Sequence, residues 1–258
     1  MSPRVILCDL DGVVWLAHTP IPGSVEAIRR AREAGCRVLF VTNNSFSTLE
    51  QQYAALDAVG IAARGDVVSS AQAAALLVEP GMKVMVCGGE GLREAVAGRG
   101  AQVVTPHAAP ELDDLFDAVV VGFYREFTWD IMRRAATAVR QGAQLIGANS
   151  DPTYPTPNGP IPGGGSVLAA IERASETSAV VAGKPHAPMA NLVAQMTDNL
   201  PPEHMVMIGD RIDTDGAFAR TLSCRFTLVL SGSTSAEAAS YADIVAKDLS
   251  EAVDQLLS

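Results

Sequence analysis

Short apolar runs rich in valine and isoleucine alternate along the chain with longer segments in which apolar residues recur at helical spacing. The run Val5–Cys8 is typical of a short buried strand, and residues 24–34 carry apolar side chains three positions apart, as a helix does. Regular alternation of strands and helices is the pattern of βαβ units, in which helices connect parallel strands. The sequence therefore predicts an α/β fold built on a parallel sheet.

The same alternation extends through the rest of the chain. Further strands are predicted at residues 37–41, 83–87, 118–121, 144–146, 180–182, 205–208 and 227–230, of which we expect the last to be the final strand. Further helices are predicted up to Ala58, at 128–140 and at 166–176. Ser47 and Glu50 have the spacing of a capping box, which predicts that they open the helix ending at Ala58.

Two loop signals divide this pattern. Glu79-Pro80-Gly81 predicts a turn, after which the alternation of strand and helix restarts. Residues 149–165 hold five prolines and four glycines between a predicted strand and a predicted helix. Because proline fixes φ, we expect this stretch to be an ordered loop rather than a flexible linker.

The chain is acidic and has few cysteines. Its 258 residues include 19 Lys and Arg against 29 Asp and Glu, a formal net charge of −10. No run of basic residues offers a surface for phosphate backbones or anionic lipids, so we expect no nucleic-acid or membrane partner. The four cysteines are spread singly, which favours buried thiols over disulfides or a zinc site. With no signal sequence and no bilayer-length apolar run, we expect a soluble, cytoplasmic protein.

The clearest chemical signal, Asp9-Leu10-Asp11-Gly12, directly follows the first predicted strand. Residues two apart in an extended chain point to the same side, so both carboxylates face one direction. They would be desolvated in the middle of a strand covered on both faces, so we expect them at its carboxyl end, where open α/β sheets bind ligands. Two adjacent carboxylates favour a cation or a proton between them. A solvated acidic turn is the alternative.

A second acidic group follows the strand predicted at 205–208. It consists of Asp210, Asp213 and Asp215, and oxygen ligands gathered in this way suit Mg²⁺. The alternatives are that Asp213 or Thr214 caps a helix, or that Arg211 merely neutralises a neighbour.

Two further polar groups follow predicted strands. Thr42-Asn43-Asn44-Ser45 precedes a helix, and its hydroxyl, amide and backbone N–H groups are suited to holding a phosphate, although ordinary capping is the alternative. Lys184 follows the strand at 180–182, and Pro185 keeps it out of the α region, so its ammonium can reach the same edge of the sheet. A surface charge is the alternative for Lys184. Four polar groups at the carboxyl ends of strands together predict one functional site.

In their order along the chain, these motifs resemble those of the haloacid dehalogenase-like phosphatase superfamily. The matching motifs are Asp9-Leu10-Asp11-Gly12-Val13, Thr42-Asn43, Lys184, and Gly209-Asp210 with Asp213 and Asp215. Finer matches point to the NagD-like branch, which includes p-nitrophenyl phosphatases and phosphoglycolate phosphatases. They are Pro20-Ile21-Pro22-Gly23, Thr42-Asn43-Asn44-Ser45, Asn149-Ser150-Asp151, Gly183-Lys184-Pro185 and Gly209-Asp210-Arg211. The resemblance covers nearly the whole chain.

The resemblance implies a Rossmann-like core with a parallel sheet and an inserted α/β cap of the C2 type. Residues 1–78 and 183–258 would form the core, and residues 79–182 the cap. The loop at 149–165 would then contact the leaving group, the alternative being that it only joins a strand to a helix. The resemblance also implies Mg²⁺ as cofactor, a small phosphorylated metabolite as substrate, and a homodimer.

The same resemblance implies roles for the site residues. Asp9 would attack phosphorus to give an aspartyl-phosphate, while Asp11 protonates the leaving alcohol and later takes a proton from water. Mg²⁺ would be held by the Asp9 side chain, the Asp11 backbone carbonyl and Asp210. Asp213 and Asp215 would orient Lys184 or metal-bound water. Four residues would bind the phosphoryl oxygens: Thr42, Asn43, Asn44 and Lys184.

Rival functions are weaker. Gly88-Gly89-Glu90-Gly91 follows a predicted strand but lacks the G-x-G-x-x-G spacing that a nicotinamide-dependent oxidoreductase needs. Dehalogenation is disfavoured because Asp11, the acid of the phosphatases, is present. A non-catalytic protein that binds phosphorylated metabolites is the alternative we keep, although such a protein would gain anion affinity by losing Asp9 and Asp11. We therefore expect a Mg²⁺-dependent phosphatase acting on a sugar, glycerol or glycolate, or nucleotide phosphate.

Overall fold

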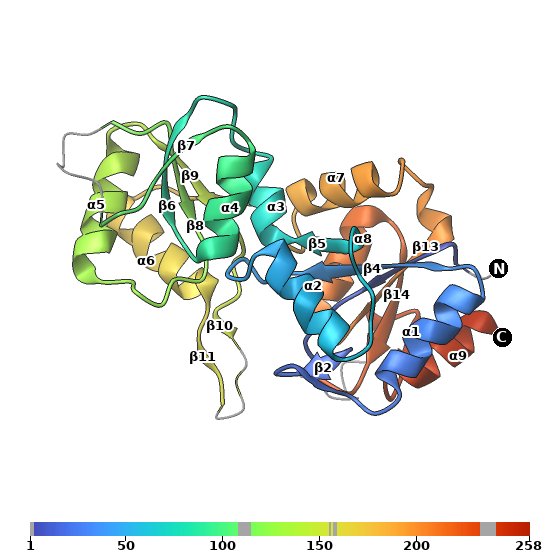
Figure 1. Ribbon diagram of the computed structural model, residues 1–258. Coiled ribbons are helices and arrows are strands. Elements are labelled where there is room, and N and C mark those ends of the chain that lie inside the picture. The colour runs from blue at the N-terminus through green and yellow to red at the C-terminus, as the bar shows by residue number, and fades with distance from the viewer. Residues whose placement is uncertain (1–2, 108–114, 155, 157–158, 233–240) are drawn as a thin grey trace. The chain divides into compact units, whose positions relative to one another are not determined.

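The computed structural model describes residues 3–107, 115–154, 156, 159–232 and 241–258 (Figure 1). Packing divides the chain into two compact units. The first lies within Met1–Thr42, Glu50–Val68 and Lys184–Ser258, and the second within Asn43–Leu49 and Ser69–Gly183. The domain boundaries expected from the sequence, residues 1–78 and 183–258 for the core and 79–182 for the cap, stay a prediction.

The first unit is built on a six-stranded sheet. In spatial order its strands are β15 (Ile244–Ala246), β14 (Arg225–Val229), β13 (Met205–Gly209), β1 (Val5–Cys8), β4 (Arg37–Thr42) and β5 (Val67–Ser69). β1 runs parallel to both neighbours, with Cys8 opposite Ile208 of β13 and Phe40 of β4. All of β1 is buried, as expected for a strand covered on both faces. The predicted parallel α/β core is confirmed.

Helices flank this sheet, and a short antiparallel hairpin follows β1. The helices are α1 (Ser24–Glu33), α2 (Leu49–Ala58), α7 (Ala187–Met196), α8 (Ala217–Leu222) and α9 (Leu249–Leu257), with a 3₁₀ turn η1 (Pro202–His204) and a π-helical turn η2 (Ile212–Gly216). The hairpin consists of β2 (Trp15–Leu16) and β3 (Thr19–Pro20). Ala27, Ile28 and Ala31 of α1 are buried, so the helical spacing predicted there is the face that packs inward.

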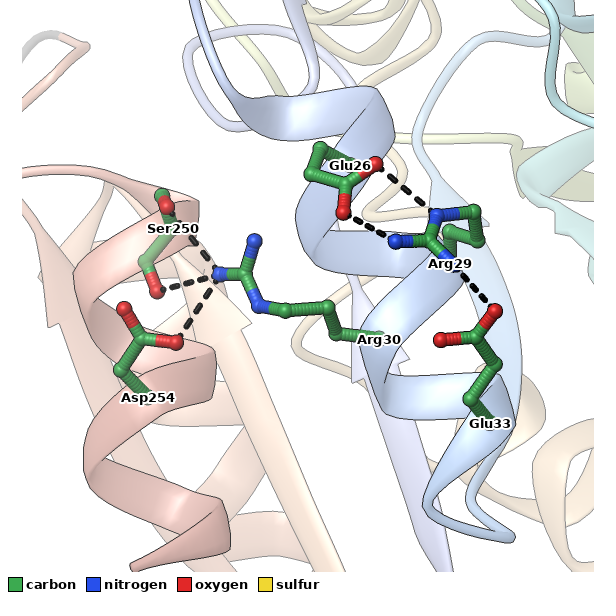
Figure 2. Close-up of polar contacts among 6 residues, drawn as sticks. All are labelled: Glu26, Arg29, Arg30, Glu33, Ser250 and Asp254. Carbon is green, nitrogen blue, oxygen red and sulfur yellow. Dashed lines mark hydrogen bonds and ion pairs between the residues drawn. The ribbon is translucent and has the colours of Figure 1, made fainter.

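Arg30 connects α1 to α9, and so links segments from the two ends of the sequence. One guanidinium nitrogen donates to the Ser250 hydroxyl at 3.1 Å, to the Ser250 carbonyl at 3.3 Å and to the Asp254 carboxylate at 3.0 Å (Figure 2). On the exposed side of α1, Arg29 pairs with Glu26 and Glu33. Because exposed ion pairs contribute little, the buried apolar face of α1 is what fixes the helix.

The second unit has a parallel sheet of its own. In spatial order its strands are β12 (Val180–Val181), β9 (Gln144–Gly147), β8 (Ala118–Val121), β6 (Lys83–Cys87) and β7 (Gln102–Val104). Val121 of β8 lies opposite Cys87 of β6 and Gly147 of β9. The α/β cap implied by the resemblance is thus present as a second parallel sheet.

Helices and a small hairpin complete the second unit. The helices are α3 (Ser70–Ala75), α4 (Glu90–Gly98), α5 (Trp129–Arg140) and α6 (Gly164–Ser175). In the loop at 149–165, β10 (Thr153–Tyr154) pairs antiparallel with β11 (Ile161–Pro162), as an ordered loop predicts. Residues 155, 157 and 158 of this loop lie outside the described residues. Ile131 and Ala135 of α5 and Leu168 and Ile171 of α6 pack into one buried cluster.

Two local predictions are wrong. The strand predicted at 227–230 is β14, and it is not the final strand, because β15 pairs with it at the edge of the sheet. Three residues are too few for hydrophobic periodicity to identify such a strand. The helix ending at Ala58 begins at Leu49, two residues after Ser47. The two groups expected to form the capping box have other partners: the Ser47 N–H donates to the Asn44 side-chain oxygen at 3.1 Å, and the Glu50 carboxylate pairs with Arg64 at 2.6 Å.

The thiols follow the prediction from the sequence. Cys8, Cys36 and Cys87 are buried, Cys224 is half-buried, and all four are free. Among the described residues, no helix combines the length and the apolar character needed to cross a membrane.

Candidate active site

Three neighbouring strands of the first unit end on polar residues predicted from the sequence. β1 lies between β13 and β4 in the sheet. Asp9 follows the end of β1, Asp210 follows the end of β13, and Thr42 is the last residue of β4. Because the carboxyl ends of parallel strands meet at one edge, these residues share the edge where open α/β sheets bind ligands.

The chain turns away from this edge directly after Asp11. The Gly12 N–H donates to the Trp15 carbonyl at 2.8 Å, and the Val14 N–H donates to the Leu10 carbonyl at 2.9 Å. Gly12 has φ of 83°, in the left-handed region that glycine adopts without steric cost. The turn leaves the half-buried Asp11 side chain at the edge of the sheet.

Lys184 lies between two carboxylates. Its Nζ atom is 2.8 Å from Asp9 Oδ1 and 2.7 Å from Asp215 Oδ1. The side chains of Lys184 and Asp215 are 2% and 0% exposed, whereas that of Asp9 is 14% exposed. Of these three groups, Asp9 is therefore the one that meets solvent, and the buried pair behind it fixes its orientation.

Burial shifts the protonation of the site. It raises the pKa of Asp9 to about 6, with Lys184 opposing the shift and Asp210 adding to it. Burial likewise raises the pKa of Asp11 to about 6 and that of Asp215 to about 7. For Lys184, burial lowers the pKa, but Asp215 and Asp9 raise it by more, so the ammonium stays protonated. A cation bound beside these buried carboxylates would favour their charged forms and so lower their pKa values.

Asp210 completes a cluster of carboxylates suited to a divalent cation. Carboxylate oxygens of Asp9, Asp210 and Asp215 all lie within 4.8 Å of one another. A Cβ atom at Gly12 would lie 2.6 Å from the Asp210 carboxyl carbon, and one at Gly232 would lie 2.1 Å from its Oδ2. The two glycines therefore form a cradle that a side chain would fill. Since Mg²⁺ prefers oxygen ligands, the residues of this cluster fit Mg²⁺.

Asp213 and Asp215 have different partners. Asp215, on the turn η2, accepts from Lys184 and also, through Oδ2, from the Arg211 backbone N–H at 3.2 Å. Asp213 is exposed and accepts two hydrogen bonds from the Arg211 guanidinium, at 2.7 and 3.1 Å. The structure thus brings Asp215 to Lys184 and Asp213 to Arg211.

Asn43 and Asn44 pack within the second unit. The Asn43 side-chain amide donates to Asp151 Oδ2 at 3.0 Å. The Asn44 side-chain oxygen accepts from the backbone N–H groups of Phe46 at 2.9 Å and Ser47 at 3.1 Å. The Asn44 side chain therefore stabilises the turn that follows Asn43.

Sequence reasoning missed Ser231 and Gly232, which follow β14. The Ser231 hydroxyl donates to the Gly12 carbonyl at 2.7 Å. Gly232 has no side chain that would collide with the Asp210 carboxylate. Their position directly after a strand is the signal that identified the other groups, so the same rule applied to β14 would have found them.

A second group that sequence reasoning missed is an aromatic cluster in the second unit, formed by Phe46, Phe123, Tyr154 and Arg125. The Phe123 ring lies 5.6 Å from the Phe46 ring and 5.3 Å from the Tyr154 ring, measured between centroids. The Arg125 guanidinium lies 5.4 Å from the centroid of Phe46 and 5.8 Å from that of Phe123. Because these side chains come from three distant parts of the sequence, no local pattern predicts their meeting.

Comparisons with known proteins agree with this geometry. The sequence matches the haloacid dehalogenase-like hydrolase family over residues 6–102 and a HAD-hydrolase-like family over residues 181–252. It is 38% identical over 246 residues to D-glycerol 3-phosphate phosphatase of Mycobacterium tuberculosis, an alignment that covers 93% of this chain but only 66% of that protein. The chain is thus shorter than this curated relative.

Solved structures show the same fold. A glycerol phosphate phosphatase from Mycobacterium tuberculosis, in complex with magnesium, superimposes with a TM-score of 0.86 at 34% identity, covering 99% of this chain and 76% of that one. A p-nitrophenyl phosphatase from Archaeoglobus fulgidus superimposes with a TM-score of 0.89 at 27% identity, covering 99% and 100%.

The parallel core sheet, the second inserted sheet and the aspartate cluster at the core edge define a hydrolase of the haloacid dehalogenase type. The chain belongs to the haloacid dehalogenase-like hydrolase family, as the resemblance of its motifs predicts. Within that family it lies in subfamily IIA, among relatives of p-nitrophenyl phosphatases and glycerol phosphate phosphatases.

Proposed function

We propose that the chain is a Mg²⁺-dependent phosphoric monoester hydrolase that acts on a small phosphorylated metabolite through an aspartyl-phosphate. The observation that carries this proposal is the Asp9 carboxylate, which meets solvent at the edge of the core sheet and is held from behind by the buried Lys184. The activities named for the relatives, phosphatases of glycerol phosphate and p-nitrophenyl phosphate, support the same reaction class.

Asp9 and Asp11 carry the bond-making and proton-transfer roles in this proposal. Asp9 attacks phosphorus in line, and the alcohol leaves as the aspartyl-phosphate forms. Asp11 gives its proton to the leaving oxygen and then takes a proton from the water that attacks the aspartyl-phosphate. Burial raises the pKa of Asp11 to about 6, close to neutral pH, where a group can both donate and accept a proton efficiently.

The metal would be held by the Asp9 and Asp210 side chains and the Asp11 backbone carbonyl. When bound, Mg²⁺ offsets the negative charge shared by the nucleophile and the phosphoryl oxygens. The acidic cluster supports this assignment, because it gathers three carboxylates, two of which contact the Lys184 ammonium.

The remaining residues bind and orient the phosphoryl group. Four residues hold its oxygens: Thr42, Asn43, Asn44 and Lys184. The Asn44 side chain also stabilises the turn that follows Asn43. Asp215 orients Lys184 through their 2.7 Å contact. Asp213 contacts Arg211, and its effect on the site is indirect.

Substrate choice belongs in this proposal to the inserted cap, residues 79–182, while residues 1–78 and 183–258 form the catalytic core. The loop at 149–165 and the aromatic cluster contact the leaving group of a sugar, glycerol or glycolate, or nucleotide phosphate. We assign the chain to the cytoplasm, with its free cysteines in support, and expect a homodimer from the resemblance of its motifs.

Turnover of p-nitrophenyl phosphate with and without Mg²⁺ tests the proposal, followed by a panel of phosphate monoesters ranked by kcat/KM. We expect turnover that requires Mg²⁺ and a ranking that favours one class of metabolite. Binding of phosphate esters without any turnover in Mg²⁺ would instead identify a binding protein on the same fold.

A further inference from the structure

Asn43, the residue that follows the last residue of β4, is held by a network of hydrogen bonds inside the second unit. Its backbone carbonyl accepts from the Ser70 hydroxyl at 2.7 Å and from the Asn149 side-chain amide at 2.8 Å. Its side-chain amide donates to Asp151 Oδ2 at 3.0 Å. Ser70 and Asn149 are buried and Asp151 is half-buried, so these bonds are shielded from competition with bulk water.

The nitrogen and the oxygen of the Asn43 side-chain amide have different surroundings. Its nitrogen faces the Asp151 carboxylate, while a Cβ atom at Gly183 would lie 2.5 Å from its oxygen. Turning the amide over would bring the Asn43 oxygen against the Asp151 carboxylate, where two acceptors repel each other. Asp151 therefore fixes which end of the amide points in which direction, and the second N–H of the planar amide is fixed with it.

The loop that carries Asp151 is itself braced. The Asp151 backbone N–H donates to the Asn149 side-chain oxygen at 3.2 Å, and the Asp151 carbonyl accepts from the Gly165 N–H at 2.9 Å, at the start of α6. A Cβ atom at Gly165 would lie 2.3 Å from the Ser150 carbonyl oxygen, so the helix reaches the loop because residue 165 is glycine. A braced loop holds its carboxylate in one place, which a positioning residue requires.

We propose that Asp151 is a positioning residue that acts through Asn43: it fixes the amide so that an N–H, not the carbonyl oxygen, is presented to a phosphoryl oxygen. The proposal rests on the proposed function, in which Asn43 binds phosphate. It separates Asp151 from the rest of the loop at 149–165, because an effect transmitted through Asn43 falls on the phosphoryl group that all substrates share. Removing the Asp151 carboxylate should therefore weaken the binding of every phosphate monoester to a similar extent.

The test compares Asp151→Ala, Asp151→Asn, Asn43→Ala and the double variant Asn43→Ala/Asp151→Ala. The readouts are KM for several monoesters and the inhibition constant of inorganic phosphate, which reports binding without chemistry. For Asp151→Ala we expect both constants to rise about five- to tenfold for every monoester, the size of one lost hydrogen bond. Asp151→Asn should be milder, because an asparagine still offers an acceptor. The double variant should bind phosphate no worse than Asn43→Ala alone.

Asp130→Ala is the matched control, because it removes an exposed carboxylate of the second unit that pairs with Arg133 and Arg134 of its own helix, α5. If Asn43→Ala weakens phosphate binding and Asp151→Ala does not, or if the two effects simply add, Asp151 has no positioning role while the proposed function stands. If Asn43→Ala leaves phosphate binding unchanged, the assigned role of Asn43 is wrong and the positioning role is wrong with it. Should Asp151→Ala not fold, the isosteric Asp151→Asn decides the matter by the same two constants.

Discussion

The two parallel sheets of this chain have the same architecture and end in different chemistry. Strands of the first unit run into Asp9 and Asp210, whereas β6 of the second unit runs into Gly88 and Gly89 and β8 runs into Gly122 and Phe123. Parallel strands alone therefore do not make an active site; the residue types placed after them do.

The corresponding edge of the second sheet, after β6 and β8, has a structural role. The Gly91 N–H, at the start of α4, donates to the Phe46 carbonyl at 2.8 Å, and the Phe123 N–H, after β8, donates to the Ser45 hydroxyl at 3.3 Å. Residues that follow β6 and β8 therefore hold the segment that carries Asn43. One edge gathers carboxylates, and the other holds a segment of the chain in place. If this comparison is right, substitutions at the first edge abolish the reaction, and substitutions at the second edge adjust it.

Removing the nucleophile should break the comparison most completely. Asp9→Asn keeps the shape of the side chain but removes its nucleophilic carboxylate, so turnover of p-nitrophenyl phosphate should fall below about a thousandth of wild type. Phosphate binding and the thermal midpoint should be preserved. Residual activity above that level would refute nucleophilic catalysis by Asp9.

Removing a metal ligand should come next. In the wild type, Mg²⁺ at 100 times its Kd should stabilise the fold by about 2.7 kcal/mol, visible as a higher thermal midpoint. Asp210→Ala should lose that stabilisation together with activity. Full recovery of the rate at excess Mg²⁺ would show that Asp210 is at most a peripheral ligand. Asp213→Ala, which removes an exposed carboxylate paired with Arg211, is the control and should keep the Mg²⁺ response.

The same Mg²⁺ response should depend on pH. The pKa of Asp9 is raised to about 6 by burial, so a proton on this carboxyl stabilises the metal-free fold as pH falls through that value. Mg²⁺ binds the deprotonated Asp9 carboxylate and competes with that proton. The rise in thermal midpoint on adding Mg²⁺ should therefore shrink between about pH 7.5 and pH 5.5, as thermal scans at fixed Mg²⁺ would show. A response that stays constant across this range would contradict the link between the raised pKa of Asp9 and the metal.

Substitutions in the aromatic cluster should have the smallest effect on the chemistry and should sharpen the comparison. Tyr154→Ala removes the ring stacked on Phe123, so kcat/KM values across a panel of monoesters should change their order while hydrolysis of p-nitrophenyl phosphate changes less. Trp129→Ala, which removes an exposed aromatic ring of α5 outside the aromatic cluster, is the control. A uniform fall across all substrates would argue against a role in specificity.

The sequence could predict which residues lie at one edge of the sheet where that follows directly from chain position. Asp9, Thr42 and Asp210 lie at or next to the ends of neighbouring parallel strands, which bring those ends together, while their roles in the reaction stay a prediction. The same rule predicts Lys184 near this edge, where it contacts Asp9, but it does not predict the contact of Lys184 with Asp215, which depends on the fold of the turn η2, 31 residues away.

The features missed from sequence depend on tertiary contacts. No periodicity links Asn43 to Asp151, 108 residues later, and nothing local assigns the segment Asn43–Leu49 to the second unit. The predicted start of α2 lies one residue too early, because Ser47 and Thr48 are both residue types that cap helices and the local sequence does not distinguish them.

The stereochemistry at phosphorus tests the central claim most directly. A thiophosphate monoester made chiral at phosphorus by sulfur and two oxygen isotopes, hydrolysed by the wild-type chain with Mg²⁺ in water enriched in the third oxygen isotope, gives chiral inorganic thiophosphate whose configuration reports how many displacements occur. Attack by Asp9 followed by attack of water is two in-line displacements, each with inversion, so the account predicts net retention of configuration. Net inversion would mean that water attacks the substrate directly, and it would contradict the aspartyl-phosphate on Asp9.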